Sequence, residues 1–202
     1  MKNIISLKRI FGAAVLLVSS LGHAAIMDFE GVVAPGAVAF GVTPFVQNGF
    51  TLIKSLPGNV DAIIGDGLSG LNGNGTAIYG WCNKCGATIN LTISAAAPFS
   101  FQSADFAALE ANGFGTYAVI GSFVGGGSIS NTFAYSDTWT TVAFSGFTNL
   151  SSLSIIGTSG NKDFAMDNLV FEGGMSVPEP GSLALFGLGL VGLAGLARKR
   201  QH

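Results

Sequence analysis

The sequence predicts an all-β fold, an antiparallel β-sandwich, on three observations. Short runs rich in β-branched and aromatic residues alternate between apolar and polar with period two. Gly, Asn and Ser separate these runs, as in turns between strands. Sixteen Phe residues supply large side chains for the space between two sheets. The best helical candidate, residues 103–112, would make one or two turns at most.

The first element is a predicted signal peptide, residues 1–24. Lys2, Lys8 and Arg9 form a positive start, residues 10–21 form an apolar run, and small residues stand at 22 and 24. This order is typical of a secretory signal that signal peptidase cuts, here after Ala24. We therefore expect the chain to be exported.

The predicted sandwich domain spans residues 25–176. Residues 88–94 alternate strictly, as in a strand with one wet face, and so do 99–103 and 117–123. The absence of any crossover helix between the runs favours antiparallel pairing. About ten strands are expected: 25–30, 50–54, 77–81, 88–94, 99–103, 117–123, 128–134, 138–144, 150–156 and 164–171.

From Phe99 onward the order of features resembles jelly-roll domains of the galactose-binding-like type. The resemblance rests on the run Phe-Ser-Phe-Gln-Ser-Ala-Asp-Phe at 99–106, on 139–147, and on a closing strand at 164–171. It implies that the sandwich is jelly-roll-like.

The last segment, residues 177–202, has three parts in a fixed order. Pro178, Glu179 and Pro180 precede an apolar run at 182–197, and a basic tail follows. As a helix the apolar run would reach about 24 Å, which is short of a hydrocarbon core of about 30 Å. The basic residues should stay on the cytoplasmic side of the membrane. They are Arg198, Lys199 and Arg200.

This segment resembles the PEP-CTERM sorting signal of bacteria that export polysaccharide. The resemblance implies that a membrane protease, an exosortase, recognises the Pro-Glu-Pro box and removes a transmembrane sorting helix. An ordinary C-terminal anchor that happens to carry these residues is the alternative.

Charge excludes several classes of function for the part between the two processed segments. Residues 25–176 hold ten Asp and Glu against three Lys, a formal charge of about −7, and hold no Arg. Nucleic-acid binding needs a basic face, which this composition does not provide. Both histidines, His23 and His202, lie outside this part, so His-dependent catalysis and His-ligated metals are excluded.

An acidic calcium site is the sharpest chemical candidate. Period two places Asp167 on the same inner face as Leu169 and Phe171, where a carboxylate needs a partner. The jelly-roll resemblance implies a structural Ca²⁺ held by Asp167 with Glu30 and Asp28, and oxygen ligands suit this ion. The alternative is that Asp167 accepts backbone hydrogen bonds without a metal. The Gly-rich stretch at 65–75 lacks EF-hand spacing and is expected to be a flexible loop.

Two further pairs carry weaker predictions. Cys82 and Cys85 in an exported chain favour a local disulfide over a redox or metal role. Tyr79 and Trp81 would suit stacking on a sugar, although packing in the core is the more common use of such rings.

Together these observations predict an exported, exosortase-sorted, non-enzymatic protein of the cell surface or extracellular matrix, associated with exopolysaccharide and biofilm. Its expected partners are exosortase, signal peptidase and extracellular polysaccharide. A dedicated carbohydrate-binding module is one alternative. A glycoside-active enzyme that uses two carboxylates is the other.

Overall fold

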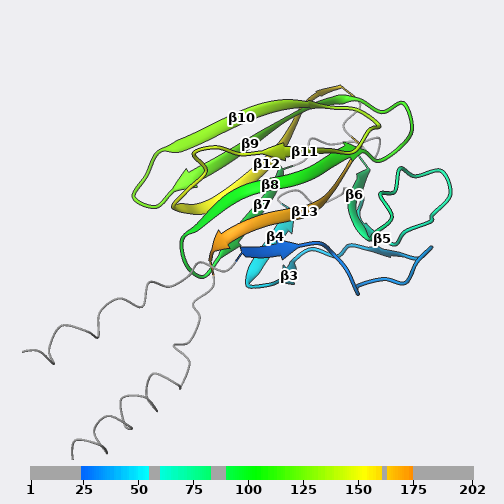
Figure 1. Cartoon of the computed structure of the whole chain (residues 1–202), viewed down its shortest axis with the longest axis horizontal. Helices are drawn as coiled ribbons and strands as arrows, with labels where there is room; N and C mark the ends of the chain where they lie inside the picture. Colours follow the sequence, from blue (N-terminus) through cyan, green and yellow to red (C-terminus); the bar gives the residue numbers. More distant parts are fainter. Residues whose placement is uncertain (1–23, 55–59, 83–89, 161–162, 175–202) are drawn as a thin grey trace, which may run out of the picture.

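The computed structural model describes residues 24–54, 60–82, 90–160 and 163–174, which contain thirteen strands (Figure 1). The strands are β1 (Ala24–Met27), β2 (Val38–Phe40), β3 (Phe45–Gln47), β4 (Phe50–Lys54), β5 (Val60–Ile64), β6 (Ile78–Cys82), β7 (Asn90–Ala95), β8 (Phe99–Ala108), β9 (Gly115–Phe123), β10 (Ser128–Tyr135), β11 (Thr140–Ala143), β12 (Leu150–Gly160) and β13 (Phe164–Gly173).

The strands form one curled sheet whose two halves face each other. The first half, here called sheet A, has the order β2-β5-β6-β13-β8-β11, with β1 also paired to β13. The second half, sheet B, has the order β10-β9-β12-β7-β4-β3. A single pairing of Leu150 with Phe99 joins the halves, and all pairings are antiparallel. The predicted antiparallel all-β sandwich is therefore confirmed.

The last strand, β13, organises sheet A. Its whole length pairs with β8 on one side. On its other side, Phe164–Met166 pair with β6 and Leu169–Glu172 pair with β1. The first and last strands of the described domain thus lie side by side, as Figure 1 shows for β1 in blue and β13 in orange.

Aromatic side chains fill the space between the sheets. Phe50 of sheet B stacks on Phe171 of sheet A with ring centroids 4.1 Å apart, and Phe99 meets both rings edge-on. Each fully buried ring contributes on the order of 2–3 kcal/mol of transfer free energy. The predicted role of the many Phe residues is confirmed by this core.

A second apolar cluster covers the outer face of sheet A. It is formed by small and branched side chains of β5, β6 and β13, with Leu109, and the loop 65–77 packs over it through Leu68 and Leu71. Asn72 fastens this loop, because its backbone N–H donates to Leu109 O and its carbonyl accepts from Trp139 Nε1. At Gly65 an added Cβ would lie 2.2 Å from Ala34 O, so only glycine fits there. The prediction of a flexible loop missed these attachments.

Several other expectations differ from the structure. Residues 103–108 belong to strand β8 and not to a helix, because they pair with β13 on one side and β11 on the other. Strands β2 and β3 have three residues each, too few for a period to show. Strand β5 was not predicted because Asp61 and Ile63 face the core while Ala62 and Ile64 face the second cluster, so no polar face appears.

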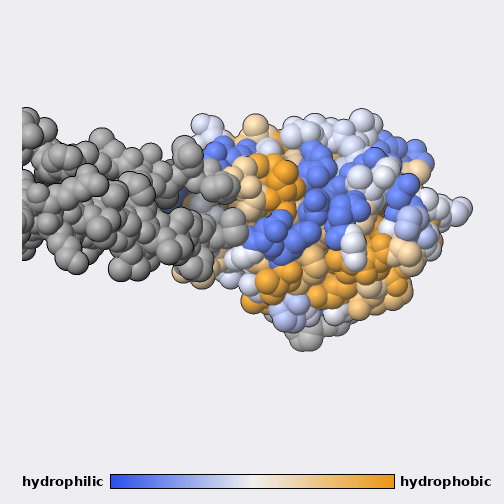
Figure 2. All heavy atoms as spheres, turned by 60° about the horizontal axis from the view of Figure 1, so that its bottom comes forward, coloured by the Kyte–Doolittle hydropathy of each residue, from blue (hydrophilic) through white to orange (hydrophobic). Residues whose placement is uncertain are grey.

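The surface combines polar and apolar areas. Figure 2 shows a face on which hydrophobic areas lie on either side of a hydrophilic band. The most exposed large apolar side chain of the described residues is Phe40, at 69%. Phe40 lies on the edge strand β2. A single exposed apolar residue is normal on a protein surface, whereas a large contiguous apolar patch is not.

Candidate functional site

Asp167 lies at a break in the pattern of strand β13. Phe164, Met166, Leu169 and Phe171 all belong to the inner core, a spacing that a regular strand cannot have. A bulge absorbs the extra residue, since Asn168 has a φ of 49° and the pairing with β8 shifts between Asp167 and Val170. Asp167 is therefore buried as predicted, but on the outer face of sheet A and not on the inner face with Leu169.

Neutral donors surround the Asp167 carboxylate. Asn74 Nδ2 and Thr76 Oγ1 each donate to Oδ2 at 2.8 Å, and the Asn168 N–H donates to Oδ1 at 2.8 Å. Burial raises the pKa of Asp167 to about 6, although these hydrogen bonds lower it and the neighbouring Asp105 raises it. One of these three bonds comes from a backbone N–H, as the alternative to a metal site expects, and the other two come from side chains.

A second carboxylate stands opposite, because Asp105 of β8 is the pairing partner of Asp167. Asn168 Nδ2 bridges the two, at 2.9 Å from Asp105 Oδ2 and 3.4 Å from Asp167 Oδ2. Thr141 Oγ1 donates to the other oxygen of Asp105. Sequence reasoning did not single out Asp105, although its place between the buried Ala104 and Phe106 predicts an outward direction.

The other two predicted calcium ligands lie in the turn after β1, and not on a first strand reaching residue 30. Phe29 between them has a φ of 59°, which ends the strand. Asp28 Oδ1 accepts from Gln47 Nε2 at 2.7 Å, whereas Glu30 Oε1 accepts from the Ala77 N–H at 2.8 Å. Glu30 thus contacts the residue after Thr76, close to Asp167, and Asp28 is held elsewhere.

No group of three or more His, Cys, Asp or Glu residues able to hold a metal ion occurs among the described residues. The calcium site of Asp28, Glu30 and Asp167 stays a prediction. Equal melting temperatures of the chain with Ca²⁺ and with a chelator would discard it.

The prediction that Tyr79 and Trp81 form a platform for sugar stacking is wrong. Both side chains of β6 are fully buried in the core between the sheets, so neither ring face can reach a saccharide. Burial, with a smaller effect of the Asp61 charge, raises the pKa of Tyr79 far above its ordinary value. The Tyr79 hydroxyl and Trp81 Nε1 are buried and have no hydrogen-bond partner among the described residues.

An ion pair that sequence reasoning missed lies beside these rings. Lys54 Nζ of β4 is 2.5 Å from Asp61 Oδ1 of β5, so the pair connects the two sheets. Thr43 donates to Asp61 Oδ2 through both its N–H and its hydroxyl, and Lys54 Nζ lies 5.8 Å from the centre of the Trp81 ring. The signal was present, since Phe50, Leu52 and Lys54 share one face of a predicted strand.

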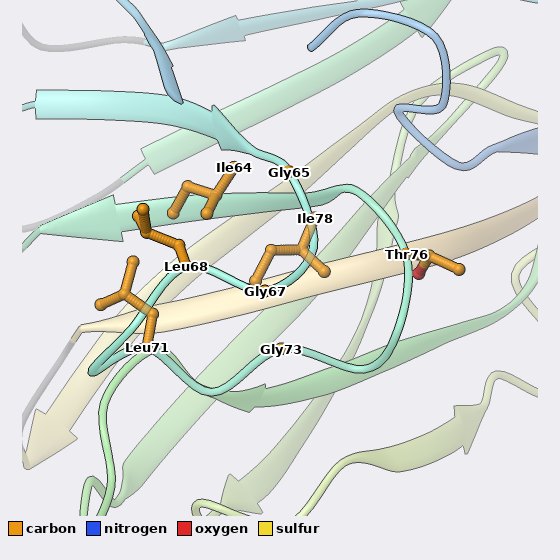
Figure 3. Close-up of a pocket in the computed structure, with 8 residues that line it drawn as sticks. All are labelled: Ile64, Gly65, Gly67, Leu68, Leu71, Gly73, Thr76 and Ile78. Carbon is orange, nitrogen blue, oxygen red and sulfur yellow. The ribbon is translucent and has the colours of Figure 1, made fainter. Parts of the chain in front are cut away.

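The hollows among the described residues include three of different size. The smallest, about 10 Å³, lies beneath loop 65–77 and has room for at most one water (Figure 3). The second, about 210 Å³, lies on the outer face of sheet A, beside the exposed Phe40 and the partly buried Glu110. The third, about 180 Å³ and here called the edge hollow, opens between β10 and β11 and is lined by Phe106, Phe133, Ala134, Tyr135, Ser136, Thr140 and Val142.

The remaining predicted sites lie outside the described residues. Cys85, the Pro178-Glu179-Pro180 box, the apolar run and the basic tail are among them, and so is the signal peptide up to residue 23. Within the ranges that the structure describes, no helix has the length and hydropathy needed to cross a bilayer. The disulfide and the processing of both ends therefore stay predictions.

Comparison with known proteins bears on the C-terminal segment and on the fold. A family model of the PEP-CTERM protein-sorting motif matches residues 176–200, which confirms the predicted sorting motif. No curated protein matches the chain. Among solved structures, a family 29 carbohydrate-binding module is 13% identical, with a TM-score of 0.44, over 75% of this chain and 88% of that one. A mutant of the module CBM29-2 is 11% identical, with a TM-score of 0.43, over 78% and 99%. The chain thus carries a segment similar to PEP-CTERM sorting motifs behind an all-β domain.

Proposed function

We propose that this chain is an exported protein that an exosortase sorts to the cell surface or the extracellular matrix, where it acts without catalysing a reaction. The observation that carries the proposal is the match of residues 176–200 to the PEP-CTERM sorting motif. In this proposal the chain is anchored in the membrane only transiently, through the segment after Pro180.

The position of the domain ends supports this arrangement. Ala24, the predicted last residue of the signal peptide, pairs with Glu172 near the end of β13. The first and last strands of the described domain therefore lie side by side in sheet A.

The acidic pair Asp105 and Asp167 gives little support to a glycoside-active enzyme. Such enzymes need two carboxylates that reach the same sugar, about 5–10 Å apart. Asp167 is fully buried under loop 65–77, and its two oxygens already accept three hydrogen bonds of 2.8 Å. A non-enzymatic role is the better supported one.

The proposal is tested by following the full chain in a bacterial host with and without a co-expressed exosortase. We expect mass spectrometry to find a product that begins at Ala25 and lacks the C-terminal segment only when exosortase is present. Replacing Glu179 by Ala should leave that segment attached, whereas Glu172→Ala, outside the motif, should be processed normally. Recovery of the intact chain from the cytosol, with both end segments retained, would overturn the proposal.

Association with exopolysaccharide is the finer part of the proposal. It is supported by the sorting motif and by a domain whose solubility depends on Ser, Thr and Asn more than on charge. Fractionation of producing cells should find the processed chain with the polysaccharide, and enzymatic removal of the polysaccharide should release it. A processed chain that stays in the free medium would contradict this part alone.

A further inference from the structure

The edge hollow lies where the sandwich is open. Strand β10 ends sheet B and strand β11 ends sheet A, and among the described strands each pairs on one side only, β10 with β9 and β11 with β8. The two sheets therefore part at this edge, and core side chains reach the surface between them. We propose that the edge hollow binds one neutral sugar ring of a polysaccharide chain, an inference that rests on the proposed association with exopolysaccharide.

Aromatic rings form the inner wall of the hollow. Phe106 of β8 and Phe133 of β10 lie with ring centroids 4.6 Å apart at an interplanar angle of 43°. Phe106 is buried, whereas Phe133 is only partly buried and so offers ring surface to a ligand. A tilted pair of rings offers apolar surface to the C–H face of a pyranose, and ligand hollows commonly combine such walls with a few polar groups.

Hydroxyl groups stand beside the rings. The Thr140 hydroxyl donates to Thr138 O at 3.3 Å, which leaves its oxygen free to accept. Ser136 Oγ accepts from the Thr138 N–H at 3.3 Å and keeps its own O–H to donate. The Tyr135 hydroxyl is buried beside that of Tyr117 and is not offered to a ligand. The hollow thus offers both acceptors and donors, as sugar hydroxyls require.

Charge selects a neutral ligand. No charged side chain is among the residues that line the hollow. The predicted exported part carries a formal charge of about −7, so it repels acidic polymers at long range. A uronic acid or a phosphate ester would find no cationic partner here, and its charge would be partly desolvated without compensation.

Size restricts the bound part to one ring. The hollow of about 180 Å³ slightly exceeds a cavity of about 150 Å³ that admits benzene, and it is smaller than the ~300–1,000 Å³ typical of drug-sized ligands. The rest of a polymer would continue along β10, where Ser130, Asn131 and Thr132 are exposed. A polar edge of this kind can hydrogen-bond further sugar units.

The test measures binding of neutral hexasaccharides of glucose, mannose and galactose to the full chain by calorimetry, in a zwitterionic detergent that contains no sugar. Phe133→Ala removes one wall of the hollow and should weaken binding at least about tenfold. Thr140→Val removes one exposed hydroxyl and should weaken it about three- to tenfold. The matched control is Thr51→Val on the outer face of β4, at the opposite end of sheet B from β10, and it should bind like the unchanged chain.

Thr140→Val also separates a binding role from a structural one. Because the Thr140 side chain is exposed on β11, its change should leave the melting temperature of the free chain nearly unchanged while affinity falls. Near-ultraviolet circular dichroism of each variant checks that the aromatic core is intact.

Three results would overturn the inference. The first is binding of neutral saccharides that is equal in all variants, which would place the sugar elsewhere and leave the proposed association intact. The second is binding of oligogalacturonate in place of neutral hexasaccharides. The third is no saccharide binding but dimerisation that Phe133→Ala abolishes, which would make this edge a protein interface. Processing by exosortase is measured separately, so none of these results touches the sorting proposal.

Discussion

Two buried carboxylates on opposite faces of sheet A reach the same burial by different means. Asp61 faces the space between the sheets and is paired with Lys54, while Asp167 faces outward beneath loop 65–77 and has only neutral donors. Both are fully buried. A buried charge is costly unless it is paired or hydrogen-bonded, and these two carboxylates show one solution each.

The difference lies in what each carboxylate connects. Asp61 connects sheet to sheet, because Lys54 comes from β4 and Asp61 from β5. Asp167 connects a loop to a sheet, since Asn74 and Thr76 belong to the segment that covers the second apolar cluster. Loss of the first should therefore loosen the sandwich, and loss of the second should loosen only its outer cover.

The largest effect is expected from Lys54→Met. This change leaves the buried Asp61 carboxylate with neutral donors from Thr43 and without its cation, and breaking a buried pair in this way costs about 3–5 kcal/mol of unfolding free energy. Urea denaturation of the full chain measures it. The double change Lys54→Met with Asp61→Leu replaces the pair by apolar groups and should recover most of the loss. A double variant as unstable as the single one would show that the charge is not the cause.

The second effect concerns the outer carboxylate. Asn74→Ala removes a donor to Asp167 and should cost about 1.5–3 kcal/mol, because a hydrogen bond to a charged buried group is lost. It should also raise the pKa of Asp167 further, since that bond lowers it. Hydrogen exchange should increase in loop 65–77 and not in β8 or β13. Asn131→Ala, at an exposed position of β10, is the control. Faster exchange throughout the sandwich would contradict the assignment of Asp167 to the cover alone.

The strands and the direction of many side chains could be predicted from local sequence patterns. The pairing partners could not, because they depend on the register between strands. Alternation predicted strand cores such as 117–123, in which every second residue from Tyr117 to Gly121 is buried. The same alternation indicates that Lys54 points inward, because it follows Phe50 and Leu52 at period two. Its partner could not be predicted, because Asp61 lies on a strand without a polar face and pairs across the sandwich.

Asp167 shows a second limit of prediction from sequence, which concerns the face of the sheet and not the pairing partner. Its burial could be predicted from its apolar neighbours, but its face could not, because one extra residue at Asn168 reverses every side chain before it. The same limit explains the failure at Tyr79 and Trp81. Their sequence does not say that β5 pairs beside β6 and that sheet B covers both rings.

The third effect is the pH dependence of stability. The pKa of Asp167 is raised from the ordinary value of 3.8, which it has in the unfolded chain, to about 6 in the folded chain. The folded state therefore binds the extra proton in this window, and its stability falls as the pH rises through about 6. From pH 5 to pH 7.5 we expect a loss of about 1.4 kcal/mol. Asp167→Ser should remove this dependence, whereas Asp137→Ser, at an exposed acid, should keep it. A chain that gains stability over this range would contradict the raised pKa.

The smallest effect isolates the neighbouring charge. Asp105 raises the pKa of Asp167, but it ranks behind burial and the hydrogen bonds among the causes. Asp105→Asn keeps an oxygen that can accept from Asn168 Nδ2 and removes the charge. The pKa of Asp167 should therefore fall, as read from its side-chain carboxyl carbon by nuclear magnetic resonance. Asp137→Asn removes an exposed charge and should leave it unchanged. If the pKa of Asp167 rose instead, the bridge through Asn168 would outweigh the repulsion, and the outer carboxylates would act as one hydrogen-bonded unit, unlike the inner ion pair.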